Sequence, residues 1–186
     1  IEVWDSRLGI EEIAGAQHNA IILQWCKDAG HPEIIEDETA WCATSMASAA
    51  KEAGLPFPPP NVNAAARSWL TMGVSVKPED AQPGDVCIWP RGRSTWQGHV
   101  NMIRHIKREG GKTLARCIGG NQGANGAVTL AGWADLAGVL PNGVRRLVPA
   151  TVKDLRKAGS TTIRDADNEE KLGILGTFFV PLFEGA

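Results

Sequence analysis

The sequence predicts an α+β domain in which a group of helices precedes an antiparallel sheet. Apolar residues recur at helical spacing in several segments before Gly54. From Gly73 onward, short apolar runs are separated by turns rich in glycine and proline, which is typical of strands. The 186 residues are enough for one domain with a full core. Helices followed by a meander of strands are characteristic of the α+β class.

The helical part is expected to contain four helices separated by short connectors. In the second of them, apolar residues lie at near-helical spacing, and Gly30 followed by His31-Pro32 ends the segment. An acidic connector over 33–38 leads to the third, and the proline-rich stretch 55–60 is a rigid break that cannot continue it. The predicted helices cover residues 6–15, 19–30, the segment from Cys42 to Gly54, and 61–70.

The second part of the chain is expected to form a sheet. Pro83-Gly84-Asp85 is a turn in front of a short apolar strand, and Val100, Met102 and Ile106 alternate along the next one. A hairpin at 109–112 connects that strand to its neighbour. The predicted strands cover residues 86–89, 98–107, 113–118, 127–130 and 144–148.

We divide the chain into a domain over residues 1–150 and a C-terminal segment over 151–186. The apolar run at 172–183 is shorter than the roughly 18 residues typical of a transmembrane helix. Two interpretations stay open: an arm that docks on the domain or on a neighbour, or the beginning of a membrane segment. Contact of this run with a membrane is therefore one expectation, and the sequence indicates no oligomeric state.

Composition narrows the classes of function. A net charge of -2 provides no cluster of basic residues for phosphates, so we expect no nucleic-acid partner. The four cysteines lack both the paired spacing of a zinc site and the density of a disulfide framework. At least three are expected to be buried structural thiols. No cofactor and no metal ion is predicted. Seven tryptophans can fill a core or line a carbohydrate or peptide cleft.

The candidate nucleophile is Cys42. Asp37 or Thr39 can cap the helix that begins near it, because a short side-chain oxygen satisfies amides of the first turn. In that turn, unpaired amides and the helix dipole favour negative charge, so we expect the thiol to ionise more easily than usual. The alternative is that Cys42 is a small buried apolar residue, as most free cysteines are.

A base and a residue that orients it can be assigned on the sheet. His99 begins a strand directly after Gly98, and an imidazole that faces Cys42 can take the thiol proton. Asn121 ends the following strand and can bond to the second ring nitrogen of His99, although a turn-forming role is equally open. The alternative orienting residues are Gln122 and the carboxylates of Asp37 and Glu38.

Four short motifs occur in the order that one group of enzymes shares. They are D-E-T-A-W-C-A at 37–43, P-G-D-V at 83–86, G-H-V at 98–100 and G-G-N-Q at 119–122. In this order they resemble the CHAP and NlpC/P60 group of papain-like cysteine hydrolases, and in detail the phage endolysin type. The resemblance covers about residues 6–149.

This resemblance implies a papain-like fold and an antimicrobial, wall-lysing activity. The enzyme would be an N-acetylmuramoyl-L-alanine amidase or a peptidoglycan endopeptidase that forms an acyl-enzyme on Cys42. By the same resemblance, His99 is the base, Asn121 is the third member, and amides at the helix start hold the oxyanion. It also implies a phage-encoded protein, made in the host cytoplasm, that acts at the bacterial cell wall in the periplasm or outside the cell.

The chain departs from the family pattern at two places, Gly119 and Thr44-Ser45-Met46. The second replaces the usual aromatic or aliphatic residue after the Cys-Ala pair and affects packing more than chemistry. Gly119 occupies a position where many members have an acidic residue, so a fourth catalytic residue is not predicted. The chain also lacks an Asp-x-Asp loop, so the calcium site of some relatives is not predicted. A second hypothesis is a non-catalytic cell-wall-binding or phage tail or assembly module with the same fold. A third is a cysteine hydrolase that acts on another amide or isopeptide.

Overall fold

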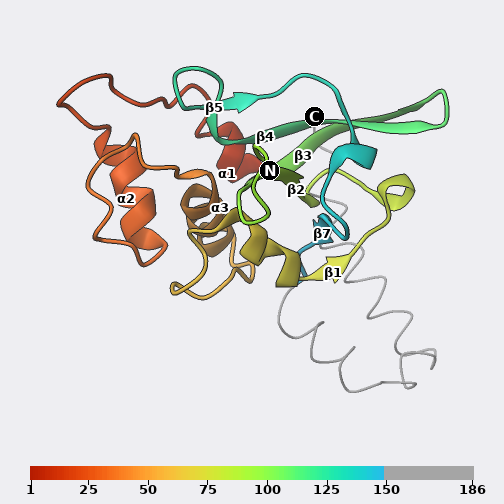
Figure 1. Ribbon diagram of the computed structural model, residues 1–186, viewed down its shortest axis with the longest axis horizontal. Helices are drawn as coiled ribbons and strands as arrows, with labels where there is room; N and C mark the ends of the chain where they lie inside the picture. Colours follow the sequence, from red (N-terminus) through yellow and green to blue (C-terminus); the bar gives the residue numbers. More distant parts are fainter. Residues whose placement is uncertain (149–186) are drawn as a thin grey trace. The chain divides into compact units, whose positions relative to one another are not determined.

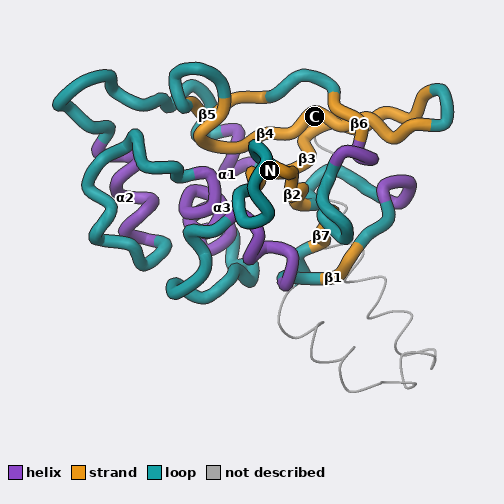
Figure 2. The backbone as a smooth tube through the Cα atoms, in the orientation of Figure 1, coloured by secondary structure: helices purple, strands orange, loops and turns teal. Residues whose placement is uncertain are grey.

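The computed structural model describes residues 1–148, which form one compact unit. The segment predicted over 151–186, with its apolar run, lies outside the described residues. Helices α2 and α3 lie together beside the sheet, and the shorter helices lie among the strands (Figures 1 and 2). Within residues 1–148, no helix has both the length and the apolar character needed to cross a membrane.

The strands of the described part form a single antiparallel sheet in the order β1-β7-β2-β3-β4-β5, with β6 paired to β4. Strands β3 and β4 form the predicted hairpin. The α+β class with an antiparallel sheet is therefore confirmed. The strands are β1 (Val74–Ser75), β2 (Val86–Pro90), β3 (Gly98–Glu109), β4 (Lys112–Gln122), β5 (Ala127–Leu130), β6 (Ala134–Asp135) and β7 (Val144–Arg146).

The helices agree only in part with the expectation. Helix α2 begins where predicted, because the Asn19 side chain accepts a hydrogen bond of 2.9 Å from the Ile21 amide. The predicted helix over 61–70 is a run of turns followed by the 3₁₀ helix η1. The helices are α1 (Glu2–Asp5), α2 (Ala20–Asp28), α3 (Cys42–Glu52), η1 (Ala66–Thr71), η2 (Pro78–Asp80) and η3 (Leu136–Gly138).

The helix predicted over 6–15 is wrong. Gly9 and Gly15 have positive φ angles of 82° and 96°, which interrupt a right-handed helix. Between them, Glu11 forms an isolated antiparallel bridge with Ala127 of β5. The Gly9 amide donates to the Val128 carbonyl at 3.0 Å, so this segment runs along the edge of the sheet instead of coiling.

Helix α3 contacts α2 on one side and strands β3 and β4 on the other (Figure 1). Its residues from Cys42 to Ala50 are all buried, and most are small, so the helix approaches the sheet closely. At the closest point a Cβ on Gly120 of β4 would lie 2.1 Å from the Trp41 ring. Only glycine fits there, and this contact fixes the start of α3 against the end of β4.

Hydrophobic clusters form on both faces of the sheet. Val100 and Met102 of β3 belong to the cluster that includes α3, whereas Ile103 belongs to the second cluster with Leu136. Neighbouring residues of a strand point to opposite faces, which accounts for this division. All four cysteines are free and buried, which confirms the prediction of buried structural thiols and leaves the role of Cys42 to its surroundings.

Candidate active site

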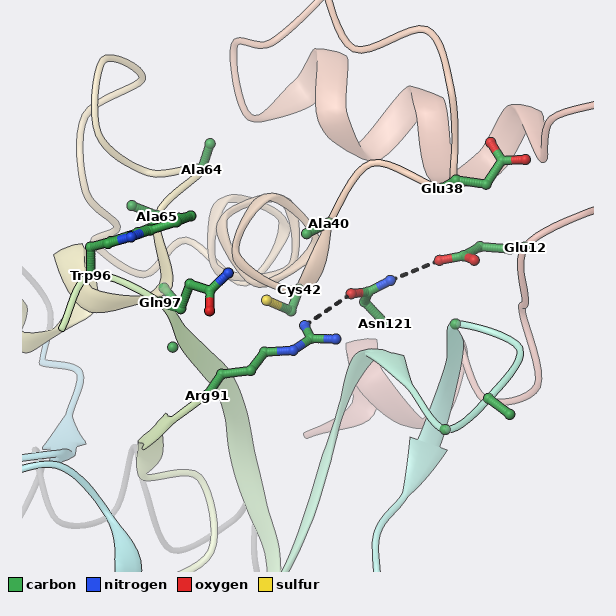
Figure 3. A pocket seen from close by; sticks show the side chains of 15 residues that line it. Glu12, Glu38, Ala40, Cys42, Ala64, Ala65, Arg91, Trp96, Gln97 and Asn121 are labelled. Atoms are coloured by element: carbon green, nitrogen blue, oxygen red, sulfur yellow. Dashed lines mark hydrogen bonds between the residues drawn. The ribbon is translucent and has the colours of Figure 1, made fainter. Parts of the chain in front are cut away.

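A cleft of about 700 Å³ opens at the start of α3. Cys42 lies in its wall with 4% of the residue exposed, and its sulfur points into the space shown in Figure 3. Loops before α3, the segment after β2 and the end of β4 supply the other walls. The charged and aromatic side chains of the lining are Glu12, Glu38, Arg91 and Trp96.

Cys42 is the first residue of α3, as the sequence predicts, but the predicted cap is wrong. The N-cap is Trp41, which makes no side-chain cap hydrogen bond. The Asp37 carboxylate instead accepts hydrogen bonds from the Ile13 and Asn19 amides. The backbone amide of Val100, the residue after His99, acts on the Cys42 thiol in the direction of a lower pKa. The structure thus brings the thiol to the start of β3, where Val100 packs in the same cluster as α3. His99 shares the face of Asn101, and no hydrogen bond joins it to Cys42 within residues 1–148.

Burial raises the pKa of the Cys42 thiol above its ordinary value. The Val100 amide, the positive charge of Arg91 and the amides of the first helical turn act in the opposite direction but do not compensate. The expectation that the helix start makes this thiol easier to ionise is therefore wrong for the resting protein. The thiol needs a base to take its proton.

His99 is half-buried, and burial lowers its pKa. The hydrogen bond to Gln122 opposes this shift, and the nearby Arg91 charge adds to it. A histidine with a lowered pKa is neutral at pH 7 and can accept a proton. The resting pair is therefore an uncharged thiol and an uncharged imidazole, with His99 suited to general-base chemistry.

A chain of hydrogen bonds on one face of the sheet determines which nitrogen of His99 carries the hydrogen. Trp89 Nε1 can only donate, and it donates to Asn101 Oδ1 at 2.9 Å. The Asn101 amide nitrogen therefore faces Gln122 Oε1 and donates to it at 3.0 Å. Gln122 Nε2 in turn donates to the Thr129 carbonyl at 2.7 Å. We call Trp89, Asn101, Gln122 and His99 the Trp89 relay.

The relay determines which ring nitrogen of His99 donates a hydrogen bond and which can accept a proton. Gln122 Oε1 can only accept, so His99 Nε2, at 3.1 Å from it, carries the hydrogen. Nδ1 then has a free lone pair, and it makes no hydrogen bond to another residue within 1–148. Nδ1 is therefore the ring nitrogen of His99 that can accept a proton.

Gln122, an alternative in the sequence analysis, bonds to His99, whereas Asn121 does not. The Asn121 amide donates to Glu12 Oε1 at 2.7 Å, and its carbonyl oxygen lies 3.4 Å from Arg91 Nη1 (Figure 3). The cause is a bulge, since β4 advances three residues from Gly119 to Gln122 while β5 advances two. Asn121 has a φ of 57° at this point. The extra residue brings Gln122 to the face that Asn121 would otherwise occupy.

The acidic alternatives are engaged away from His99. Asp37 is fully buried and accepts hydrogen bonds from the Ile13 and Asn19 amides at 2.9 and 2.8 Å, and His18 Nδ1 lies 3.0 Å from its other oxygen. Burial alone raises its pKa, but these bonds outweigh it and the pKa is lowered. Glu38 Oε2 lies 3.2 Å from the same His18 nitrogen. These three side chains could ligate a metal, but each already has a protein partner.

Sequence reasoning missed Trp89, Asn101 and Glu12. Asn101 carried a usable signal, because an amide two residues after His99 interrupts an apolar strand and shares its face. Glu12 carried none, since it reaches the cleft through the loop that was predicted to be a helix. Comparisons of this chain with models of known protein families, with curated proteins and with solved structures find no match.

Proposed function

We propose that this protein is a cysteine hydrolase of papain-like type that cleaves an amide bond in the peptide of the bacterial cell wall. Cys42 is the nucleophile, His99 the base, and Gln122 the residue that orients His99. The order of the four sequence motifs supports the substrate class. The observation that carries the chemistry is the fixed tautomer of His99, which precedes Val100 in β3, the residue whose amide acts on the Cys42 thiol.

The mechanism follows from the roles of these atoms. His99 Nδ1 takes the proton of the Cys42 thiol, and the thiolate attacks the amide carbonyl carbon. Amides at the start of α3 stabilise the negative oxygen that forms. Collapse of this intermediate breaks the C–N bond, and His99 gives its proton to the leaving amine. A water molecule, deprotonated by His99, then hydrolyses the thioester and restores the thiol.

The test is digestion of purified peptidoglycan, with released amino groups counted and the fragments identified by mass spectrometry. We expect Cys42→Ala to abolish release of amino groups while the circular dichroism spectrum stays unchanged. Cys87→Ala is the matched control, because it removes another buried thiol that does not line the cleft. Full activity of Cys42→Ala would exclude the proposal. The new ends on the fragments distinguish an amidase from an endopeptidase and from a hydrolase of another amide.

A second candidate is a wall-binding module without catalysis. Two observations favour it: both Cys42 and His99 are held uncharged, and Trp96, 73% exposed, offers a flat surface in the same cleft. Alkylation of Cys42 by iodoacetamide at pH 7 separates the two. If the protein is an enzyme, His99→Ala should slow the alkylation of Cys42 about 100-fold, which is the lower end of the rate effect of a positioned base. A binding module predicts equal, slow alkylation in both proteins and sedimentation with cell walls.

A further inference from the structure

Arg91 is the single cationic side chain in the lining of the cleft, within the part of the chain that the structure describes. It follows the last residue of β2 and is exposed. Figure 3 shows its guanidinium group extending toward the space in front of Cys42. The charge lies close enough to lower the pKa of both Cys42 and His99. Any group bound by Arg91 therefore lies beside the reacting atoms.

The hydrogen-bonding capacity of Arg91 is almost unused. A guanidinium group has five N–H donors, and Arg91 makes one contact, 3.4 Å from Nη1 to the neutral oxygen of Asn121. That distance is at the long end for a hydrogen bond. No carboxylate of residues 1–148 forms an ion pair with it. Arg146, by contrast, bonds to both oxygens of Asp85 at 2.8 and 2.9 Å.

Neighbouring hydrogen bonds fix which atom of the Asn121 amide faces the Arg91 guanidinium group. Trp41 Nε1 can only donate, and it donates to Glu12 Oε1 at 2.8 Å. Asn121 Nδ2 donates to the same oxygen at 2.7 Å, so the Asn121 carbonyl oxygen faces Arg91. Glu12 itself is packed against Gly126, where a Cβ would lie 1.9 Å from Oε1. Asn121 is therefore a positioning residue for Arg91.

We propose that Arg91, oriented by Asn121, binds a free carboxylate of the substrate next to the amide bond that Cys42 attacks. The proposal rests on the proposed function and adds a substrate class, peptides with an unmodified carboxylate beside the scissile bond. A planar guanidinium group with free donors fits a carboxylate with two parallel hydrogen bonds. Such a pair recognises the group by geometry as well as by charge.

The experiment compares native cell walls with walls whose carboxylates have been converted to methylamides by carbodiimide coupling. We expect Arg91→Gln to reduce kcat/KM on native walls about 10- to 100-fold, the range for losing a hydrogen bond to a charged group. On methylamide walls, wild type and Arg91→Gln should differ little. Arg91→Lys should recover only part of the loss. Arg93→Gln, in the same loop but outside the cleft lining, should behave as wild type.

A binding measurement keeps this proposal separate from the hydrolase proposal. Cys42→Ala and Cys42→Ala/Arg91→Gln are sedimented with both wall preparations. Preferential sedimentation with native walls that depends on Arg91 supports the carboxylate site, even if no amino groups are released by wild type. Equal sedimentation of both proteins with both walls, or an Arg91→Gln enzyme that keeps the wild-type preference for native walls, overturns it.

Discussion

The Trp89 relay predicts that Gln122, and not Asn121, controls the tautomer of His99. In Gln122→Ala, His99 Nε2 loses the acceptor at 3.1 Å that holds its hydrogen. One neutral hydrogen bond contributes about 0.5–1.5 kcal/mol, which corresponds to a change of about 2- to 12-fold in the ratio of the two tautomers. The ring also loses its orientation. Residues that orient a metal-ligating histidine typically affect activity about 10- to 100-fold, and we expect kcat/KM to fall by about the same factor here.

The assay is a long-range ¹H–¹⁵N correlation spectrum of the histidine rings, recorded at a pH where His99 is neutral. Wild type should show the Nε2–H tautomer in excess, and Gln122→Ala should show a share of the Nδ1–H tautomer that is larger by about 2- to 12-fold. The pKa of His99 should also fall further in this variant, because the bond from Gln122 raises it. Asn121→Ala leaves the relay complete and is the matched control for the tautomer.

Trp89→Phe provides a second perturbation that leaves the Gln122 side chain in place. It removes the donor to Asn101 Oδ1, whereas Gln122 keeps the orientation that its Nε2 takes from the Gly119 and Thr129 carbonyls, so the Nε2–H tautomer should remain. The reasoning is refuted if Asn121→Ala changes the tautomer while Gln122→Ala leaves it unchanged. Because the spectrum needs no substrate, this result does not depend on whether the protein is a hydrolase.

Two further predictions concern packing and pH. Gly120→Ala should lower the free energy of unfolding by at least about 1–3 kcal/mol, because the new methyl group collides with the Trp41 ring. Urea denaturation measures this loss. Gly132→Ala is the control, because a Cβ at Gly132 meets no atom within 4 Å. Equal unfolding midpoints for the two variants would contradict the close contact. The acid limb of kcat/KM should lie below the ordinary histidine pKa of about 6.5, because burial lowers the pKa of His99 and the base must be neutral. In Arg91→Gln this limb should move to higher pH, and a limb at or above the ordinary value in wild type would be inconsistent with a buried base.

The parts of the fold that depend on local signals were predictable. Asn19 caps α2, and the alternation along β3 identifies the strand that carries His99. The segment 6–15 was mispredicted because its apolar spacing suits a helix, whereas pairing with β5 and two glycines of positive φ determine its path. Pairing between distant residues leaves no local pattern in the sequence.

The candidate site shows the same division. Cys42 and His99 could be found because each begins an element that the sequence marks clearly. The orienting residue could not be chosen, since one extra residue in β4 exchanges the faces of Asn121 and Gln122, and a strand pattern does not reveal a bulge. Trp89 and Asn101 come together only because β2 and β3 pair in a register in which Trp89 lies opposite His99 and Cys87 lies opposite Asn101. The sequence does not reveal this register.

The segment around Glu11 covers the edge strand β5 and so affects the tendency of this protein to associate through its sheet. β5 is the last strand in the sheet order, and an uncovered edge strand offers free amides and carbonyls to any passing chain. Here the Val128 amide donates to the Ile10 carbonyl at 2.8 Å and the Val128 carbonyl accepts from the Gly9 amide at 3.0 Å, so both groups are already occupied. The residues that bring Glu12 to the cleft thus also protect this edge from strand addition, and loss of the segment would expose the protein to aggregation.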